Sequence, residues 1–129
     1  MVKKLYLIAL LVFLVDQILK FVFLDNELFI FKSSLNTGAA FGLLKNWNTF
    51  LIFFGLLVIG IILYYRNEKK LQTGMGFLLG GVASNVIDRI FYRGVIDYIH
   101  FDFMNNVFNL ADVANIIGAL ILVYHFWKE

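Results

Sequence analysis

The chain of 129 residues contains no cysteine and no proline, only three serines, and two histidines. The lack of cysteine excludes disulfide bonds and thiol nucleophiles. None of the serines, Ser33, Ser34 and Ser84, lies in a Gly-x-Ser-x-Gly run, which argues against a serine hydrolase. The histidines, His100 and His125, are not paired at helical spacing and no His-Glu-x-x-His run occurs, so no metal and no cofactor is predicted.

Charge is also scarce. Charged residues make up 16% of the chain and apolar residues 61%, with a mean hydropathy of +0.83. This composition is typical of membrane proteins. Four stretches are long enough to cross a hydrocarbon core of about 30 Å, which takes about 20 helical residues: residues 5–24, 49–65, 71–90 and 108–127. With no linker or internal repeat, the sequence predicts one domain, residues 1–129, an all-α membrane protein with four transmembrane helices.

The distribution of basic residues predicts the orientation of these helices. If the four spans alternate in direction, one side of the membrane receives Lys3, Lys4, Arg66, Lys69, Lys70 and Lys128. The opposite loops hold Lys32, Lys45 and Arg93. Because basic residues are retained on the cytoplasmic side, both termini are predicted to be cytoplasmic. The stretch 25–48 and the connection 91–107 then face outward.

The outer stretch has a different character from the spans. Residues 28–33 are rich in bulky apolar side chains without a helical stripe, and residues 36–42 contain two glycines. This pattern predicts a short strand and a turn, and so a small β-like element on the extracytoplasmic side. Trp47, beside polar residues, suits an anchor at the membrane interface.

Small residues recur at helical spacing in the last two predicted spans. Gly76, Gly80 and Ser84 follow one another every four residues, and Ala111, Ala114 and Gly118 offer a similar surface. Such spacing lets helix backbones approach closely in lipid. These residues are therefore expected to face neighbouring helices.

Two charged side chains lie inside the first predicted span. Asp16 falls near mid-bilayer, where a carboxylate costs roughly 2.5–3.5 kcal/mol on insertion scales. Lys20 follows four residues later on the same helical face, so the favoured interpretation is an ion pair that holds this helix in the bundle. The alternatives are that Lys20 extends outward to the interface and that Asp16 takes part directly in chemistry.

Three polar residues share one face at the end of the third predicted span. They are Asn85, Asp88 and Arg89, at spacings of three and four. A guanidinium stays charged and cannot act as a base, so Arg89 is expected in a buried arginine–carboxylate network that orients its neighbours. Asp88 remains an alternative catalytic group.

Two further carboxylates, Asp97 and Asp112, lie on either side of the last connection and are expected near the same face of the membrane. Repulsion and partial desolvation split the pKa values of such a pair, so that one holds a proton while the other accepts one and activates a water. The alternative for Asp112 is a helix-capping role, with Asn109 as the N-cap. Asn109 and Asn115 flank Asp112 around the predicted helix and are expected to orient its carboxylate.

Five motifs in this order resemble the bacterial lipoprotein signal peptidases, the signal peptidase II family: VDQILK, NTGAAFG, GGVASNVIDR, GVIDYIHF and FNLADVANIIG. The resemblance covers nearly the whole chain. It implies an aspartyl endopeptidase of the bacterial cytoplasmic (inner) membrane, which removes signal peptides from diacylglyceryl-modified prolipoproteins just before the lipidated Cys. The outer stretch is then similar to the family's small sheet-like cradle around the substrate.

The resemblance also implies roles for individual residues. The family's catalytic pair falls on Asp97 and Asp112. Its supporting and substrate-binding residues fall on Asp16, Lys20, Asn36, Gly38, Asn85, Asp88, Arg89, Asn109 and Ala111. The expected partners are lipid-modified prolipoproteins and membrane lipids, with no nucleic acid, and the chain is expected to be a monomer.

Two other functions stay open on the residues alone. A small transporter or proton-conducting bundle could use Asp16, Asp88 and Asp97 as relay sites, although such a path needs carboxylates at several depths. A hydrolase acting on lipid head groups would keep the two carboxylates and add a basic phosphate clamp, for which Arg89 and Arg93 are available.

Overall fold

The computed structural model describes residues 2–38 and 47–129. In this part of the chain the α-helices are α1 (Lys3–Val22), α2 (Asn48–Tyr64), α3 (Gln72–Tyr92) and α4 (Leu110–Lys128), with a 3-10 turn η2 (Lys69–Leu71) before α3. The strands are β1 (Phe31–Asn36), β2 (Val95–His100) and β3 (Val107–Phe108). Most of the predicted turn at 36–42, and Lys45, lie outside the described residues.

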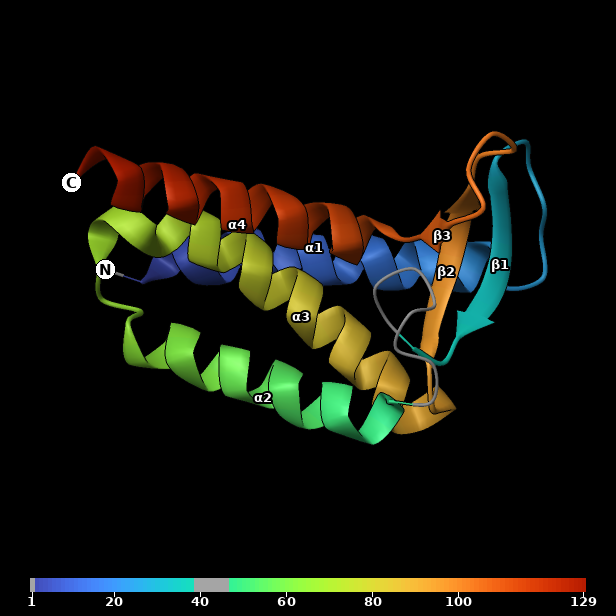
Figure 1. Ribbon diagram of the computed structural model, residues 1–129, viewed down its shortest axis with the longest axis horizontal. Helices are drawn as coiled ribbons and strands as arrows, with labels where there is room; N and C mark the ends of the chain where they lie inside the picture. Colours follow the sequence, from blue (N-terminus) through green and yellow to red (C-terminus); the bar gives the residue numbers. More distant parts are fainter. Residues whose placement is uncertain (1, 39–46) are drawn as a thin grey trace.

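The four predicted helices are confirmed, and each end lies within two residues of its predicted position. Among the described residues, α1 and α4 are long and apolar enough to cross a membrane by length and composition, and α2 is a shorter apolar helix. The helices form a bundle with both ends of the chain at one end of it and the sheet at the other (Figure 1).

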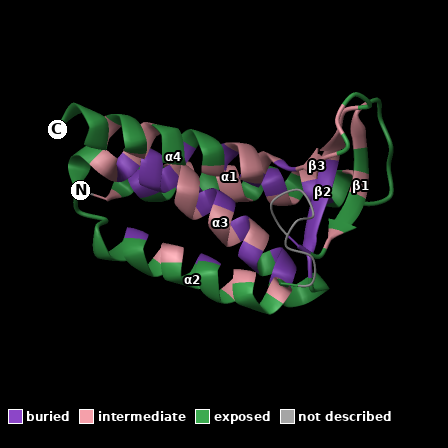
Figure 2. Cartoon of the chain, in the orientation of Figure 1, coloured by how far each residue is buried: buried purple, intermediate pink, exposed green. Residues whose placement is uncertain are grey.

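Burial in this bundle differs from that in a water-soluble protein, because large apolar side chains lie outside and many polar ones are buried beside the apolar core. Exposed residues follow the outward faces of α1, α2 and α4 (Figure 2), and they include large apolar side chains such as Phe21, Phe53, Leu120 and Trp127. The buried set also contains many polar residues: Asp16, Lys20, Gln72, Ser84, Asp88, Arg89, Asp97 and Asn109. Exposed apolar surface of this extent indicates contact with lipid rather than water.

The predicted close packing of small residues is confirmed. A Cβ added at Gly80 would collide with the backbone of Ala9 in α1, and one at Gly76 would collide with Ile8. On the other side of α3, a Cβ at Gly118 of α4 would meet the Gly74 carbonyl oxygen. The helix α3 therefore packs backbone to backbone between α1 and α4, and its buried polar residues face both neighbours.

The sheet is antiparallel with strand order β1-β2-β3. Ser34 of β1 lies opposite Asp97 of β2, and Ile99 lies opposite Phe108 of β3. The chain turns from α3 into β2 through Arg93, which has a left-handed backbone with φ of 57°. The central strand β2 is thereby fixed directly over the end of α3.

The predicted small β-like element is confirmed as a three-stranded sheet, and β1 overlaps the strand predicted at 28–33. The fold is thus mostly helical with a sheet larger than expected, because β2 and β3 form where no strand was predicted. The segment Val95–His100 is rich in the strand-favouring residues Val, Ile and Tyr, and pairing with the distant strand β1 places it in the sheet. Phe108, predicted to begin the last helix, belongs to β3, and α4 begins two residues later because Asn109 caps it.

Candidate active site

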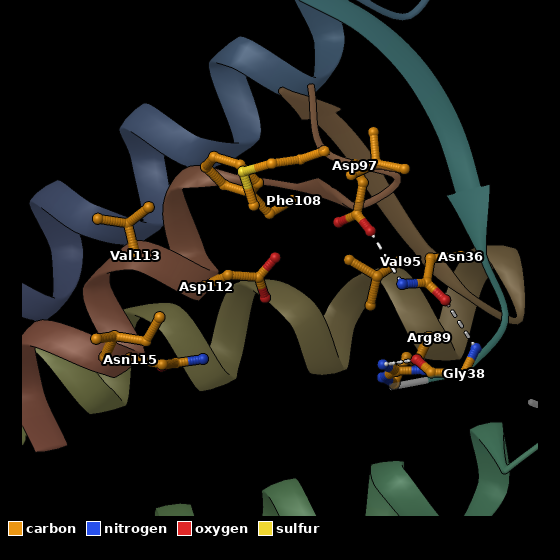
Figure 3. A pocket seen from close by; sticks show the side chains of 12 residues that line it. Asn36, Gly38, Arg89, Val95, Asp97, Phe108, Asp112, Val113 and Asn115 are labelled. Atoms are coloured by element: carbon orange, nitrogen blue, oxygen red, sulfur yellow. Dashed lines mark hydrogen bonds between the residues drawn. The ribbon is translucent and has the colours of Figure 1, made fainter. Parts of the chain in front are cut away.

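The fold brings the two outer carboxylates to one cavity. Asp97 extends from the central strand β2, and Asp112 lies in the first turn of α4. Both line a cavity of about 410 Å³, into which their side chains point from opposite sides (Figure 3). Residues from β1, α3, β2 and α4 surround this space, so it forms only when the sheet and the bundle are joined.

Asn109 links the two carboxylates. Its Nδ2 donates to Asp97 Oδ1 at 3.0 Å, while its Oδ1 accepts from the Asp112 backbone N–H at 2.8 Å. The Asp112 carboxylate in turn accepts from the Asn109 backbone N–H at 3.0 Å, which completes a capping box at the start of α4. The predicted cap is therefore confirmed, and the same hydrogen bonds fix Asp112 relative to Asp97.

Each oxygen of the two carboxylates accepts one amide N–H. Besides Asn109, Asn36 of β1 donates to Asp97 Oδ2 and Asn85 of α3 donates to Asp112 Oδ1, both at 3.0 Å. Because a carboxylate oxygen has two acceptor sites, each one keeps a lone pair for water or substrate. The prediction that Asn115 would orient Asp112 is wrong within the described residues, because Asn85 supplies that amide.

The protonation of Asp97 is shifted by its surroundings. Burial, and secondly the nearby Asp112 carboxylate, raise the pKa of Asp97 to about 7. The hydrogen bond from Asn36 and the positive charges of Lys20 and Arg89 oppose this rise. Near neutral pH, Asp97 can therefore hold a proton or release it at little cost, as acid–base chemistry requires.

A cluster of three charged residues, the Lys20 cluster, lies in the bundle interior. Lys20 Nζ is 2.7 Å from Asp16 Oδ2 and 2.8 Å from Asp88 Oδ2, and all three side chains are buried. The predicted Asp16–Lys20 pair is confirmed, and Lys20 does not extend outward. Its ammonium also lies 3.2 Å from Asn85 Oδ1, the far end of the amide that holds Asp112.

Asp16 joins four elements through its carboxylate. Oδ1 accepts from the Tyr98 hydroxyl of β2 at 2.7 Å and from the Ala111 backbone N–H of α4 at 3.1 Å. Oδ2 accepts from Ser84 of α3 at 2.6 Å. Burial, followed by the Asp16 charge, raises the pKa of Tyr98, so its hydroxyl stays protonated and donates. Asp16 thus ties together the two elements that carry Asp97 and Asp112.

Asp88 and Arg89 serve different parts of the site. Asp88 Oδ2 accepts from the Ile96 backbone N–H at 3.0 Å, which holds β2 beside Asp97. Arg89 donates to the Gly38 carbonyl at 2.8 Å and to Asn48 Oδ1 at 3.3 Å. The predicted arginine–carboxylate network is wrong among the described residues, since successive residues of a helix point about 100° apart and lysine pairs with Asp88 instead.

The structure places the other predicted residues around the same cavity. Gly38 is buried, and its backbone N–H donates to Asn36 Oδ1 at 3.0 Å. Gln17 and Tyr98 also contact this site and were not predicted, although a glutamine within an apolar helix was a usable signal. Gln17 Nε2 donates to Asp88 Oδ1 at 3.0 Å. The tyrosine followed a predicted catalytic residue, but nothing local indicated that its hydroxyl would reach Asp16.

The cavity places two carboxylates beside an apolar lining, an arrangement that can support acid–base chemistry on a bond of a bound substrate. Its apolar lining includes Met104, Val107, Phe108, Val113 and Ile116. Within residues 2–38 and 47–129, no three His, Cys, Asp or Glu side chains gather in a way that could hold a metal ion. The titratable groups that line this cavity include two carboxylates with fixed amide partners.

Comparisons with known proteins give independent information. A family model described as signal peptidase (SPase) II matches residues 8–128 of the chain. Two solved structures, both described as a bacterial membrane enzyme determined by the in meso method, share the fold at 26% sequence identity. One, at 2.3 Å resolution, has a TM-score of 0.80 over 95% of this chain and 86% of its own. The other, at 1.9 Å, has a TM-score of 0.77 over 95% of this chain and 92% of its own.

Proposed function

Because the chain belongs to the signal peptidase II family, we propose that it removes signal peptides from diacylglyceryl-modified prolipoproteins by cleaving just before the lipidated Cys. Membership of this family makes the chain a protease of lipoprotein processing. The aspartic mechanism rests on one observation, namely that Asp97 and Asp112 face one cavity with every carboxylate oxygen held by an amide.

In the proposed mechanism the carboxylate pair, Asp97 and Asp112, shares one proton. The ionised member takes a proton from a water, whose oxygen then bonds to the scissile carbonyl carbon, while the protonated member donates to the carbonyl oxygen. The tetrahedral intermediate collapses as the C–N bond breaks. The protonated member of the pair donates to the leaving nitrogen, while the ionised member takes the proton of one hydroxyl of the intermediate, which restores the single shared proton. Because the two carboxylates are coupled, the pair titrates as a unit. The reaction requires the state in which the pair holds one proton.

We further propose that all four helices cross the bacterial cytoplasmic membrane, with both termini cytoplasmic and the sheet on the outer side. The support is the basic residues near the ends of the chain and the position of the sheet at the opposite end of the bundle (Figure 1). The carboxylate pair then lies near the outer boundary of the membrane. A single domain acting as a monomer is sufficient, since one chain supplies both carboxylates.

The substrate is proposed to enter sideways from the bilayer. Ile116 lines the cavity and is also 60% exposed on the outward face of α4, so the apolar wall of the cavity continues onto surface that contacts lipid. A signal peptide could reach the carboxylate pair along this wall while the acyl chains of its diacylglyceryl group remain in the membrane. The apolar parts of the substrate would then not have to leave the membrane for the aqueous phase.

The head-group hydrolase is less well supported than the peptidase. That function needs a basic clamp facing the cavity. Arg89 does line the cavity, but its guanidinium already donates to the Gly38 carbonyl and to Asn48. The proton-relay alternative is also weakened, because Asp16 and Asp88 share the ammonium of Lys20 rather than facing an aqueous path. The proton-relay alternative also leaves the amide partners of Asp97 and Asp112 without a role.

The first test of the proposed function is dependence on lipid modification. The purified protein in detergent should cleave a diacylglyceryl-modified precursor and leave the same precursor with an unmodified Cys intact. The product is identified by mass spectrometry, which also gives the cleavage position. Cleavage of both precursors at equal rates, or of neither, would contradict the proposal.

The pH dependence of cleavage follows from the raised pKa of Asp97. Above about pH 7 Asp97 is ionised and no longer supplies the proton that the mechanism requires, so kcat/KM should fall as the pH rises through this value. The hydrogen bond from Asn36 favours the ionised form of Asp97. Asn36→Leu should therefore raise the pKa further and move the fall in kcat/KM to higher pH, whereas Ser34→Ala, with an exposed side chain in the same strand, should leave it in place. A movement to lower pH in Asn36→Leu would contradict this assignment.

A further inference from the structure

Asn115 has an unusual position in the cavity. It lies in α4 three residues after Asp112 and contributes to the same cavity lining (Figure 3). Its Oδ1 is buried and, among the described residues, has no hydrogen-bond donor. Buried polar groups are nearly always paired, so the described residues leave the carboxamide of Asn115, at the wall of the cavity, incompletely satisfied.

The fold makes specific room for this side chain. A Cβ at Gly81 of α3 would collide with both Asn115 Oδ1 and the Ala111 carbonyl oxygen. The carboxamide therefore occupies space that exists only because residue 81 has no side chain. Two acceptor oxygens, Asn115 Oδ1 and the Ala111 carbonyl oxygen, therefore lie against Gly81 of α3. The amide nitrogen of Asn115, Nδ2, faces the cavity (Figure 3).

A half-turn of the carboxamide about its last side-chain bond resolves this conflict. It would bring Nδ2 to the Ala111 carbonyl oxygen and turn Oδ1 into the cavity. Oδ1 then needs a donor from whatever occupies the cavity. A peptide main chain offers N–H groups, whereas a diacylglyceryl ester offers only acceptors. The ligand chemistry that fits Asn115 is therefore a peptide group.

The position of Asn115 indicates which part of a peptide it would meet. Three residues of α-helix rise about 4.5 Å, so Asn115 lies about this far from Asp112 along α4, away from the sheet. An extended peptide advances about 3.3 Å per residue. A peptide whose scissile bond lies at the carboxylate pair would thus present one of its next two peptide groups to Asn115, on the side that continues into the bundle.

We propose that Asn115 binds the substrate main chain, accepting a hydrogen bond from a peptide N–H one or two residues from the scissile bond on the signal-peptide side. This inference rests on the proposed function. A main-chain contact holds the segment extended regardless of its side chains. It also pairs a peptide group that would otherwise lack a partner near the hydrocarbon region of the membrane.

The test combines a protein variant with altered substrates. Asn115→Leu, which keeps the volume of the side chain and removes its hydrogen bonding, should lower kcat/KM for a lipidated peptide about tenfold, mainly through KM. Asn67→Leu, an exposed asparagine between α2 and η2, is the matched control and should behave like the unaltered protein. Melting temperatures in detergent establish that both variants are folded.

The substrates are lipidated peptides in which one amide near the scissile bond, on the signal-peptide side, is replaced by an ester, which removes a single N–H. One replacement should cost the unaltered protein about tenfold in kcat/KM and cost Asn115→Leu nothing further, because the two changes remove the same hydrogen bond. Equal losses in both proteins, or no loss at either of the first two positions, would overturn the role of Asn115. Failure of the unaltered protein to cleave the all-amide peptide would instead overturn the proposed function.

Discussion

Asp97→Asn and Asp112→Asn should each lower the rate of precursor cleavage by a factor of about 10³, in the middle of the range for a general acid or base. Asparagine has nearly the same shape as aspartate but cannot take up or release the proton that the mechanism moves. A single remaining carboxylate can act as acid or as base, but not as both in one turnover. The double variant should therefore be little slower than either single variant.

Cleavage of a lipidated precursor by purified variants measures this effect. Both oxygens of each carboxylate accept N–H groups, so an introduced NH₂ group faces a donor, and folding must be monitored by thermal unfolding in detergent. Asp102→Asn is the control, since Asp102 is exposed in the loop after β2. Near-normal cleavage by both folded single variants would remove the carboxylate pair from the mechanism.

Asp16→Asn should lower the free energy of unfolding by about 3 kcal/mol, at the lower end of the range for breaking a buried ion pair. Lys20 keeps its contact with Asp88, which is why the loss is not expected to be larger. The new NH₂ group would face donors from Tyr98 or Ser84, which adds to the cost. The folded fraction should keep more of its activity than either variant of the carboxylate pair, because Asp16 supports the site without touching the scissile bond.

Unfolding of the detergent-solubilised variant by heat or denaturant, with kcat measured at a temperature where it is folded, separates the two effects. Tyr98→Phe removes one donor to Asp16 and should cost about 1–2 kcal/mol, less than Asp16→Asn. Glu27→Gln, which disrupts an exposed pair with Lys32, is the control for a surface charge. A fully stable but inactive Asp16→Asn protein would assign Asp16 to the chemistry and contradict the supporting role.

The helices and their contact faces were predictable because the signals for them are local. Apolar stretches of membrane-spanning length predicted each helix to within two residues, since hydropathy along a single segment decides whether it forms a helix in lipid. The spacing of Gly76 and Gly80 predicted close packing, and the ion pair of Asp16 with Lys20 followed from four-residue spacing on one helix. The motifs also indicated the family, and the match over residues 8–128 confirmed it.

Contacts between distant segments were not predictable in the same way. Strand β2 pairs with β1, about sixty residues earlier, and β3 pairs with β2, so the sheet depends on contacts that a single segment does not specify. The partner of Asp88 proved to be Lys20 from another helix rather than its neighbour Arg89. Asn115 was expected to orient the Asp112 carboxylate, but Asn85 of α3 donates the hydrogen bond that does so. The face that α3 turns toward α4 depends on the close packing of Gly74, Gly81 and Gly118 at their contact, which the sequence of α4 alone does not reveal.

The sequence by itself determined the membrane class, the four helices and the family, and it predicted the residues proposed for the chemistry. Only the tertiary structure decided how Asp97 and Asp112 share a cavity, which amide holds each oxygen, and how Asp16 joins the strand and the helix that carry them. The physical reason is that helix formation and insertion depend on each segment alone. The hydrogen bonds of a buried polar site instead depend on the relative positions of four elements, which close packing fixes only once the whole chain has folded.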